Sequence, residues 1–258
     1  GELVARNCLI QIQMVRAFAF LLLLLTAQML YAQSVKNFSE TSKPEDAGFS
    51  QARLQNIDKL LDQNIKEQNI PGAVVLIVRN GKIAYFKSFG YSDLEKKAAL
   101  KRDDIFRIAS QSKAITSLAV MMLWEEGKFL LDDPVSKYIP EFKNPKVIKS
   151  FNKEDSSFTT EPAAREITIR HLLTHSSGID YAVIGSAEFT AIYAKAGIPS
   201  DIANDGDVLA DKMKILGTMP LKHQPGEGWT YGLNTDVLGY LVEVWSGQSF
   251  DEFLKTRI

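Results

Sequence analysis

The order of apolar and polar positions predicts a helix followed by a β-hairpin at the start of the folded region. Residues 50–69 carry apolar side chains at helical spacing behind Ser50, which can cap the helix. Residues 73–86 then hold two apolar runs on either side of Asn80-Gly81, the dipeptide most typical of a tight hairpin turn. A helix next to an antiparallel hairpin indicates an α+β fold, in which an antiparallel sheet is flanked by helices.

The most apolar segment after this hairpin, residues 106–127, predicts one long helix. Ser110 or Ser112 can cap its start, and Gly127 suits a left-handed residue at its end. Between residues 114 and 124 the helix is apolar on nearly every face, so we expect protein to surround it.

The remainder of the chain predicts a mainly helical insertion at about residues 135–225, followed by further helices. Within the insertion, residues 144–165 are polar and irregular, whereas residues 167–178 form a short helix that ends in a glycine turn. A glycine-rich loop at residues 224–231 leads to a tyrosine and then to an amphipathic helix that starts at residue 234 or 235.

Composition places the chain among globular proteins and gives no sign of a nucleic-acid partner. With 258 residues, of which 45% are hydrophobic, the chain can bury the core of one domain. Its formal net charge is −1 and the two signs are mixed along the sequence, so no nucleic-acid binding is expected.

Residues 1–32 have the pattern of upstream residues followed by a signal peptide. A short basic start at residues 14–16 precedes an apolar run at residues 17–25, and Ala32 is a small residue suited to cleavage. The run is shorter than the roughly 20 residues that a membrane-spanning helix needs. We therefore expect export to the periplasm or the exterior, with no stable membrane span after cleavage; an uncleaved signal that acts as an anchor is the alternative.

The rest of the chain divides into a polar linker, residues 33–48, and one folded domain, residues 49–258. Cys8, the only cysteine, lies in the predicted leader, so the exported chain would have no disulfide and no thiol chemistry. Its three histidines lack the spacing of a zinc site, and no nucleotide-binding loop occurs. We expect neither a metal nor another cofactor.

Ser110 and Lys113 introduce the candidate chemistry at the start of the long helix. Side chains at this spacing project from the same face of a helical turn, so the Ser110 hydroxyl would lie beside an amine. A partly desolvated amine can accept the hydroxyl proton, and the free amides of a helix start can face an oxyanion. The same S-x-x-K spacing recurs at Ser150 and Lys153 without an apolar helix behind it, so the spacing alone is weak evidence.

Five sequence blocks together resemble one protein family. They are Pro71-Gly72 with the hairpin, residues 106–127, residues 131–135 (LDDPV), residues 171–178 (HLLTHSSG) and residues 225–231 (PGEGWTY). In order and context they are similar to the beta-lactamase-related serine hydrolases, which include class C beta-lactamases, D-alanyl-D-alanine carboxypeptidases and serine esterases. The resemblance runs from about Phe49 to the end of the chain and implies the penicillin-binding fold.

The resemblance also implies roles for individual residues. Ser110 would be the acylated nucleophile, Lys113 its proton-handling neighbour, and Tyr231 the tyrosine of the family's Tyr-x-Asn motif, which shares the base role and protonates the leaving group. The third motif position is Leu233, with Asn234 one residue later, and this departure favours the esterase-like or peptidase-like branches. The implied substrate is a beta-lactam, a D-alanyl peptide derived from peptidoglycan, or a small ester.

The family's third motif, a strand with Lys-Thr-Gly or His-x-Gly, has no counterpart after Ser249. The family's last strands and final helix are not matched either. We therefore interpret the chain as a fragment with an incomplete sheet and expect it to be inactive alone. The alternative to an exported serine hydrolase is a non-catalytic binding or scaffolding relative with the same fold.

Two further residues each allow two interpretations. His175 could pair with Ser176 or Ser177 as a nucleophile and its base, or it could be a hydrogen-bonded turn histidine; no G-x-S-x-G elbow supports the first reading. Trp229 either lines the pocket or only packs against the fold.

Overall fold

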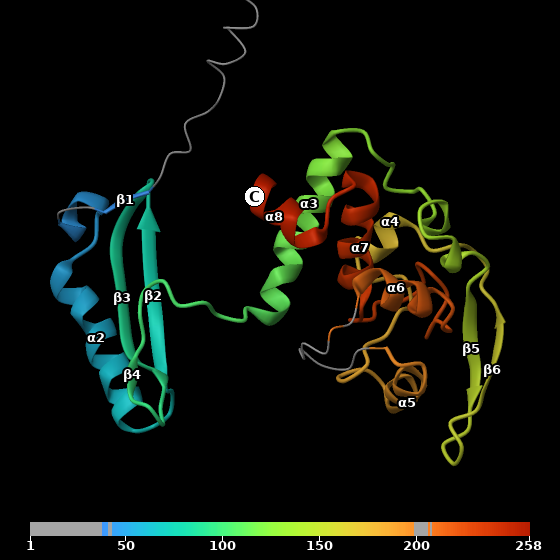
Figure 1. The fold of residues 1–258 in the computed structure, drawn as a ribbon, viewed down its shortest axis with the longest axis horizontal. Helices are drawn as coiled ribbons and strands as arrows, with labels where there is room; N and C mark the ends of the chain where they lie inside the picture. The colour runs from blue at the N-terminus through green and yellow to red at the C-terminus, as the bar shows by residue number, and fades with distance from the viewer. Residues whose placement is uncertain (1–37, 41–42, 199–205, 207) are drawn as a thin grey trace, which may run out of the picture. The chain divides into compact units, whose positions relative to one another are not determined.

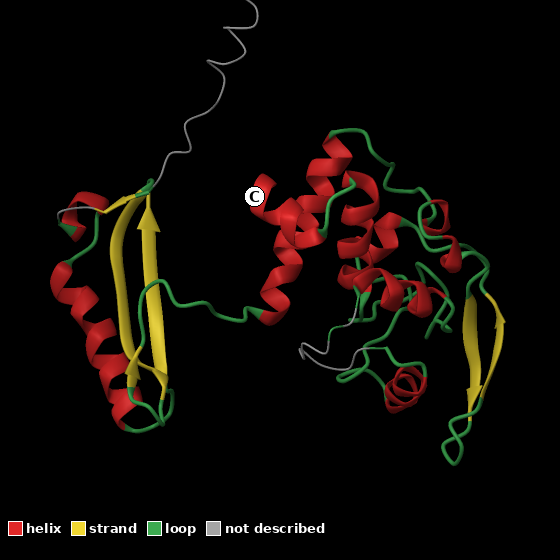
Figure 2. Ribbon diagram, viewed as in Figure 1, coloured by secondary structure: helices red, strands yellow, loops and turns green. Residues whose placement is uncertain are grey.

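The computed structural model describes residues 38–40, 43–198, 206 and 208–258, and it divides into two compact units (Figure 1). The first unit extends to Phe106, and the second runs from Arg107 to Ile258. Strands pair into a sheet in the first unit and helices dominate the second (Figure 2), which confirms the predicted α+β class.

The predicted signal peptide and Cys8 lie outside the described residues. Among the residues that the structure does describe, no helix is both long and apolar enough to cross a membrane.

In the first unit, helix α2 (Gln51–Lys66) packs along a small sheet. The side chain of Ser50 accepts a hydrogen bond from Arg53 N at the start of α2, which confirms the predicted cap. Three short elements accompany them: β1 (Ser39–Glu40), parallel to β3; the 3₁₀ turn η1 (Pro44–Ala47); and β4 (Ala98–Ala99), antiparallel to β3.

The sheet is built on the predicted hairpin. β2 (Gly72–Arg79) pairs antiparallel with β3 (Lys82–Asp93). The turn residues Asn80 and Gly81 have φ angles of 51° and 73°, both in the left-handed region. A type I′ turn requires this conformation at both central positions, and Asn-Gly is the dipeptide that adopts it at least cost.

The core of the second unit is organised around helix α7 (Asn234–Ser246), which packs against α3, α4, α6 and α8. Figure 1 shows α3 and α8 lying beside it. The helices are α3 (Ser112–Glu125), α4 (Ile169–Leu173), α5 (Ala187–Lys195), α6 (Leu209–Gly217) and α8 (Phe250–Arg257), and the 3₁₀ turns are η2 (Ala109–Gln111), η3 (Val135–Lys137) and η4 (Pro140–Phe142).

Helix α3 begins differently from the prediction. The turn η2 precedes it, its N-cap is Gln111, and no side chain caps it, so the predicted caps Ser110 and Ser112 are wrong. The side facing α7 is buried, but Leu118 and Trp124 are 50% and 40% exposed. Within the described part of the second unit, protein therefore covers only part of the helix.

The segment predicted to be irregular, residues 144–165, instead contains a hairpin of β5 (Lys146–Phe151) and β6 (Phe158–Pro162). Most side chains of this hairpin are polar, so the sequence lacks the apolar alternation that would predict its strands. Val147 is buried and packs the hairpin against the rest of the unit. Ser150, the serine of the second S-x-x-K copy, lies on β5 with its Oγ 2.5 Å from Thr159 Oγ1. That copy is therefore not a helix start.

Candidate active site

Ser110 lies in the turn η2, directly before helix α3, and its side chain is exposed. Lys113 lies on the first turn of α3, with its Nζ 3.4 Å from Ser110 Oγ. Ala109, the residue directly before Ser110, has a φ of 46°. This left-handed conformation costs a residue with a Cβ roughly 1 kcal/mol or more. This backbone strain beside an exposed hydroxyl is typical of a functional turn.

Tyr231 completes the predicted set from the other end of the unit. Its hydroxyl lies 2.6 Å from Ser110 Oγ, across a sequence separation of 121 residues, and either oxygen can be the donor. The structure thus brings Ser110, Lys113 and Tyr231 together, while their catalytic roles stay a prediction. A hydroxyl within hydrogen-bond distance of a potential base is the geometry of an activated nucleophile.

The amine of Lys113 lies close to two aromatic rings, those of Tyr231 and Tyr181. Lys113 Nζ lies 4.9 Å from the centroid of the Tyr231 ring and 5.8 Å from that of Tyr181. Hydrogen bonds with Ser110 and then Lys113 lower the pKa of Tyr231, whereas partial burial and the charge of Asp236 oppose this shift. The phenolate of Tyr231 is therefore easier to form than that of an ordinary tyrosine, which suits a proton acceptor for Ser110.

The loop that carries Tyr231 packs tightly against the segment after α4. A Cβ on Gly232 would lie 2.1 Å from the carbonyl oxygen of Ile179, so only glycine fits there. The amide of Leu233 donates to the carbonyl of Asp180 at 3.2 Å. The ring of Tyr181 stacks on that of Tyr231, with centroids 5.8 Å apart and planes 4° apart.

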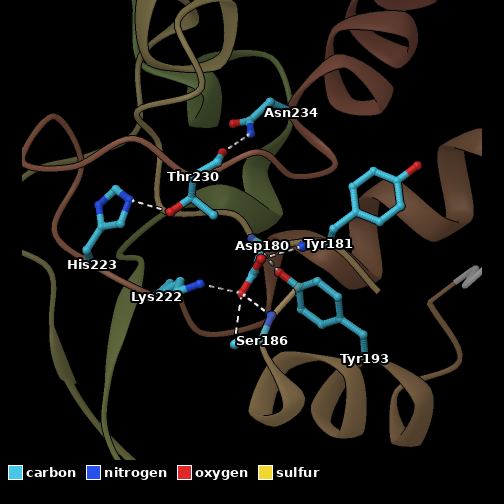
Figure 3. A network of polar contacts seen from close by, with 8 residues as sticks. All are labelled: Asp180, Tyr181, Ser186, Tyr193, Lys222, His223, Thr230 and Asn234. Atoms are coloured by element: carbon cyan, nitrogen blue, oxygen red, sulfur yellow. Dashed lines mark hydrogen bonds and ion pairs between the residues drawn. The ribbon is translucent and has the colours of Figure 1, made fainter. Parts of the chain in front are cut away.

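Asp180 organises this segment, and the sequence analysis missed it. Its side chain is 1% exposed, and Figure 3 shows it at the centre of a polar network. Oδ1 accepts from the amide of Tyr181 at 2.8 Å, while Oδ2 accepts from the amide and hydroxyl of Ser186 and from Lys222 Nζ at 3.1 Å. A buried carboxylate with this many donors fixes the backbone that presents the Tyr181 ring.

Replacing Asp180 with alanine should lower the free energy of unfolding by roughly 3 kcal/mol, because several partly buried donors lose their acceptor at once. Urea unfolding of the variant measures this change. Asp251→Ala is the matched control, since Asp251 is 68% exposed and pairs with Lys255 at 2.9 Å. We expect this variant to change the free energy of unfolding far less, because an exposed ion pair contributes little. Equal effects of the two variants would contradict the assigned role of Asp180.

The structure decides between the two interpretations of His175. Ser177 is 0% exposed and its hydroxyl bonds to Asn234 Oδ1, while the Ser176 hydroxyl lies 2.8 Å from that of Thr174. Neither serine is presented as a nucleophile with His175 as its base. His175 is a hydrogen-bonded turn residue, bonded to Asn234 at 3.0 Å.

Asn234 does not face the nucleophile. It is the first residue of α7, is 0% exposed, and uses its amide to bond Ser177 and His175. Leu233 is buried as well, at 6% exposure. Neither residue offers a side-chain amide to a substrate, in agreement with the predicted departure from Tyr-x-Asn.

Trp229 is 69% exposed, so it does not pack into the core. Its ring centroid lies 6.3 Å from that of Tyr231 and 6.1 Å from that of His175. Val183 and Ile184, from the segment after Tyr181, are also exposed. An exposed indole near the Tyr231 ring suits contact with an apolar substrate group. Among the described residues, no cluster of acidic, histidine or cysteine side chains could hold a metal ion.

One family model and several known proteins match this chain. A family model described as Beta-lactamase matches residues 57–258. Esterase EstB of Burkholderia gladioli is 36% identical over 203 residues, which are 79% of this chain and 47% of EstB. Protein flp of Staphylococcus aureus (strain N315) is 32% identical over 207 residues, which are 78% of this chain and 35% of flp.

A solved structure supports the same relationship. EstCE1, described as a hydrolase with promiscuous acyltransferase activity, matches with a TM-score of 0.67 and 32% identity over 81% of this chain and 51% of that one. The chain thus spans about half or less of the length of these relatives.

Proposed function

Because the chain belongs to the beta-lactamase family of serine hydrolases, we propose that it hydrolyses small esters through an acyl-enzyme formed on Ser110. The observation that carries the proposal is the cluster of Ser110, Tyr231 and Lys113. The serine oxygen lies 2.6 Å from the Tyr231 hydroxyl and 3.4 Å from Lys113 Nζ. This arrangement provides a nucleophile, a proton carrier and a cation in one place.

In the proposed reaction, Ser110 Oγ attacks the ester carbonyl carbon while its proton passes to the oxygen of Tyr231. Lys113 stabilises the negative charge on the phenolate, and the backbone amide of Ser110 donates to the carbonyl oxygen, which becomes an oxyanion. The bond to the alcohol then breaks, and Tyr231 returns the proton to the departing alkoxide. Water attacks the acyl-enzyme by the same route and restores the Ser110 hydroxyl, so one ester and one water give an acid and an alcohol.

Two features favour an ester over a beta-lactam or a D-alanyl peptide. The buried positions of Leu233 and Asn234 leave no side-chain amide there to bind the amide of a lactam or peptide substrate. An ester with an apolar group needs no such contact, and the exposed indole of Trp229 can bind that group. The relative EstB is named an esterase, which is consistent with an ester as the substrate.

The proposal is tested with the protein produced from its complete reading frame. We expect kcat/KM for a p-nitrophenyl ester to exceed that for a chromogenic cephalosporin and for a D-alanyl-D-alanine peptide by at least about fivefold. The reason is that one absent hydrogen bond to a substrate amide costs about 1 kcal/mol or more. Faster cleavage of the cephalosporin or the peptide would overturn the choice of ester. No turnover of any of them, with a properly folded protein, would favour the non-catalytic binding relative.

A further inference from the structure

A short chain of buried hydrogen bonds connects the glycine turn after α4 with the start of α7. Ser177 Oγ accepts from the amide of Ile179 at 3.0 Å and lies 2.5 Å from Asn234 Oδ1. Asn234 Nδ2 lies 3.0 Å from His175 Nδ1 and 3.4 Å from the carbonyl oxygen of Thr230. Since Ser177 and Asn234 are 0% exposed, water does not compete for these bonds.

The direction of each bond follows from the available donors and acceptors. Because the carbonyl oxygen of Thr230 can only accept, Asn234 directs Nδ2 toward it and Oδ1 toward Ser177, whose hydroxyl donates to Oδ1. Asn234 Nδ2 then donates to Thr230 and to His175 Nδ1. A ring nitrogen that accepts a hydrogen bond carries no proton, so the neutral imidazole of His175 has its hydrogen on Nε2.

His175 also contacts the segment that carries the reactive tyrosine. Its ring stacks on Tyr231 with 5.3 Å between centroids and 25° between planes, and its carbonyl oxygen accepts from the amide of Thr230 at 2.8 Å. Its φ of 54° lies in the left-handed region, which is uncommon for a residue other than glycine. The bond to Asn234 and the contact with Tyr231 therefore hold a ring whose backbone is strained.

We propose that His175 is a positioning residue for Tyr231, held as the neutral Nε2–H tautomer by Ser177 and Asn234. This rests on the proposed function, in which Tyr231 carries the proton during ester hydrolysis. When Nδ1 of His175 is protonated, its N–H points at the N–H of Asn234 Nδ2. The hydrogen bond between the two residues is then lost, and the ring is no longer held. Protonation also adds a second positive charge close to Lys113. The protein is thus active with neutral His175 and loses activity as this residue becomes protonated.

The surroundings of the ring favour its neutral form. Burial, followed by the charge of Lys113 on α3, lowers the pKa of His175, while a backbone hydrogen bond with Thr230 acts in the opposite direction. The phenol of Tyr231 faces the ring from the loop before α7, and the uncharged indole of Trp229 lies beside it. Because the pKa is lowered, the neutral form persists to a more acidic pH than that of an ordinary histidine.

The tautomer can be tested directly by nitrogen-15 NMR of the imidazoles in the whole protein. Variants His171→Gln, His175→Gln and His223→Gln assign the signals of the three histidines in this chain. We expect His175 to show a bare Nδ1 and a protonated Nε2 near neutral pH. A proton on Nδ1 in the neutral ring would overturn the proposal, whether or not the protein hydrolyses esters.

The positioning role is tested by Asn234→Asp. A carboxylate accepts a hydrogen bond from Nδ1–H, and an opposite charge at this distance raises the pKa of a histidine by roughly one to three units. We expect the NMR titration of His175 to move to higher pH by about one unit or more. The acidic limb of kcat/KM for the ester should instead move to lower pH, because the carboxylate still holds the ring after His175 is protonated. Asn56→Asp, on the exposed surface of α2, is the matched control and should move neither.

Two results would contradict the positioning role. If the His175 titration moves in Asn234→Asp and the acidic limb does not, protonation of this ring does not control catalysis. If Asn234→Asp does not fold, Ser177→Ala replaces it, because loss of the serine hydroxyl frees the amide to rotate. The acidic limb should then shift in the same direction by a smaller amount, and an unchanged limb would overturn the proposal.

Discussion

Replacing Ser110 with alanine should reduce ester hydrolysis by at least about 10⁴-fold, because no step of an acyl-enzyme mechanism can proceed without the nucleophile. The serine oxygen lies 2.6 Å from the Tyr231 hydroxyl and 3.4 Å from Lys113 Nζ, so its removal also takes away the atom on which both partners act. The measurements are kcat for a p-nitrophenyl ester and intact mass after treatment with a fluorophosphonate. The variant should show no gain in mass.

The chain contains its own control for this experiment. Ser150 and Lys153 have the same spacing as Ser110 and Lys113, but Ser150 lies on strand β5 and bonds to Thr159. Ser150→Ala should label and turn over like the unchanged protein. A fluorophosphonate adduct that survives Ser110→Ala would show that another residue is the nucleophile.

Two of the three clustered residues of the candidate site could be predicted from local sequence. Ser110 and Lys113 stand one helical turn apart, so a correct helix prediction already places both side chains together. Tyr231 is 121 residues away from Ser110, and no periodicity indicates which loop reaches the serine. Only the resemblance of five separate blocks to a known family identified the tyrosine.

Asp180 shows what neither the pattern nor the resemblance could provide. The residue is a single acid in a glycine-bounded turn, and its donors come from Tyr181, Ser186 and Lys222, which follow no common spacing. Its importance arises from burial, because a carboxylate at 1% exposure must be satisfied by whatever donors the fold brings to it. Burial of a lone acid is a property of the tertiary structure and cannot be read from its neighbours in sequence.

The same distinction explains the outcomes for the fold. The turn at Asn80-Gly81 was predicted correctly because its φ angles are a local property of these two residues. The hairpin of β5 and β6 was not predicted, since its strands pair mainly with each other and buried Val147 gives little apolar pattern. The start of α3 was also wrong, because the turn η2 holds Ser110 toward Tyr231 instead of leaving it to cap the helix.

Replacing Tyr231 with phenylalanine should lower kcat for the ester by roughly 10² to 10⁴-fold, the usual contribution of a positioned general acid or base. The phenyl ring keeps the stacking contacts with Tyr181 and His175, at 5.8 Å and 5.3 Å between centroids, so the fold and KM should change little. Only the proton carrier is removed. Tyr91→Phe, at an exposed position on β3, is the matched control and should keep full activity.

The pH dependence gives a second and independent readout of the same variant. The pKa of Tyr231 is lowered by its hydrogen bonds with Ser110 and Lys113, and the form that accepts the serine proton is the phenolate. Activity of the unchanged protein should therefore rise with pH twice, once as His175 loses its proton and once until the pH passes the lowered pKa of Tyr231. Tyr231→Phe has no phenolate to form, so the rise that belongs to Tyr231 should disappear from its residual rate. A variant that keeps both its kcat and the rise would show that Lys113 alone activates the serine.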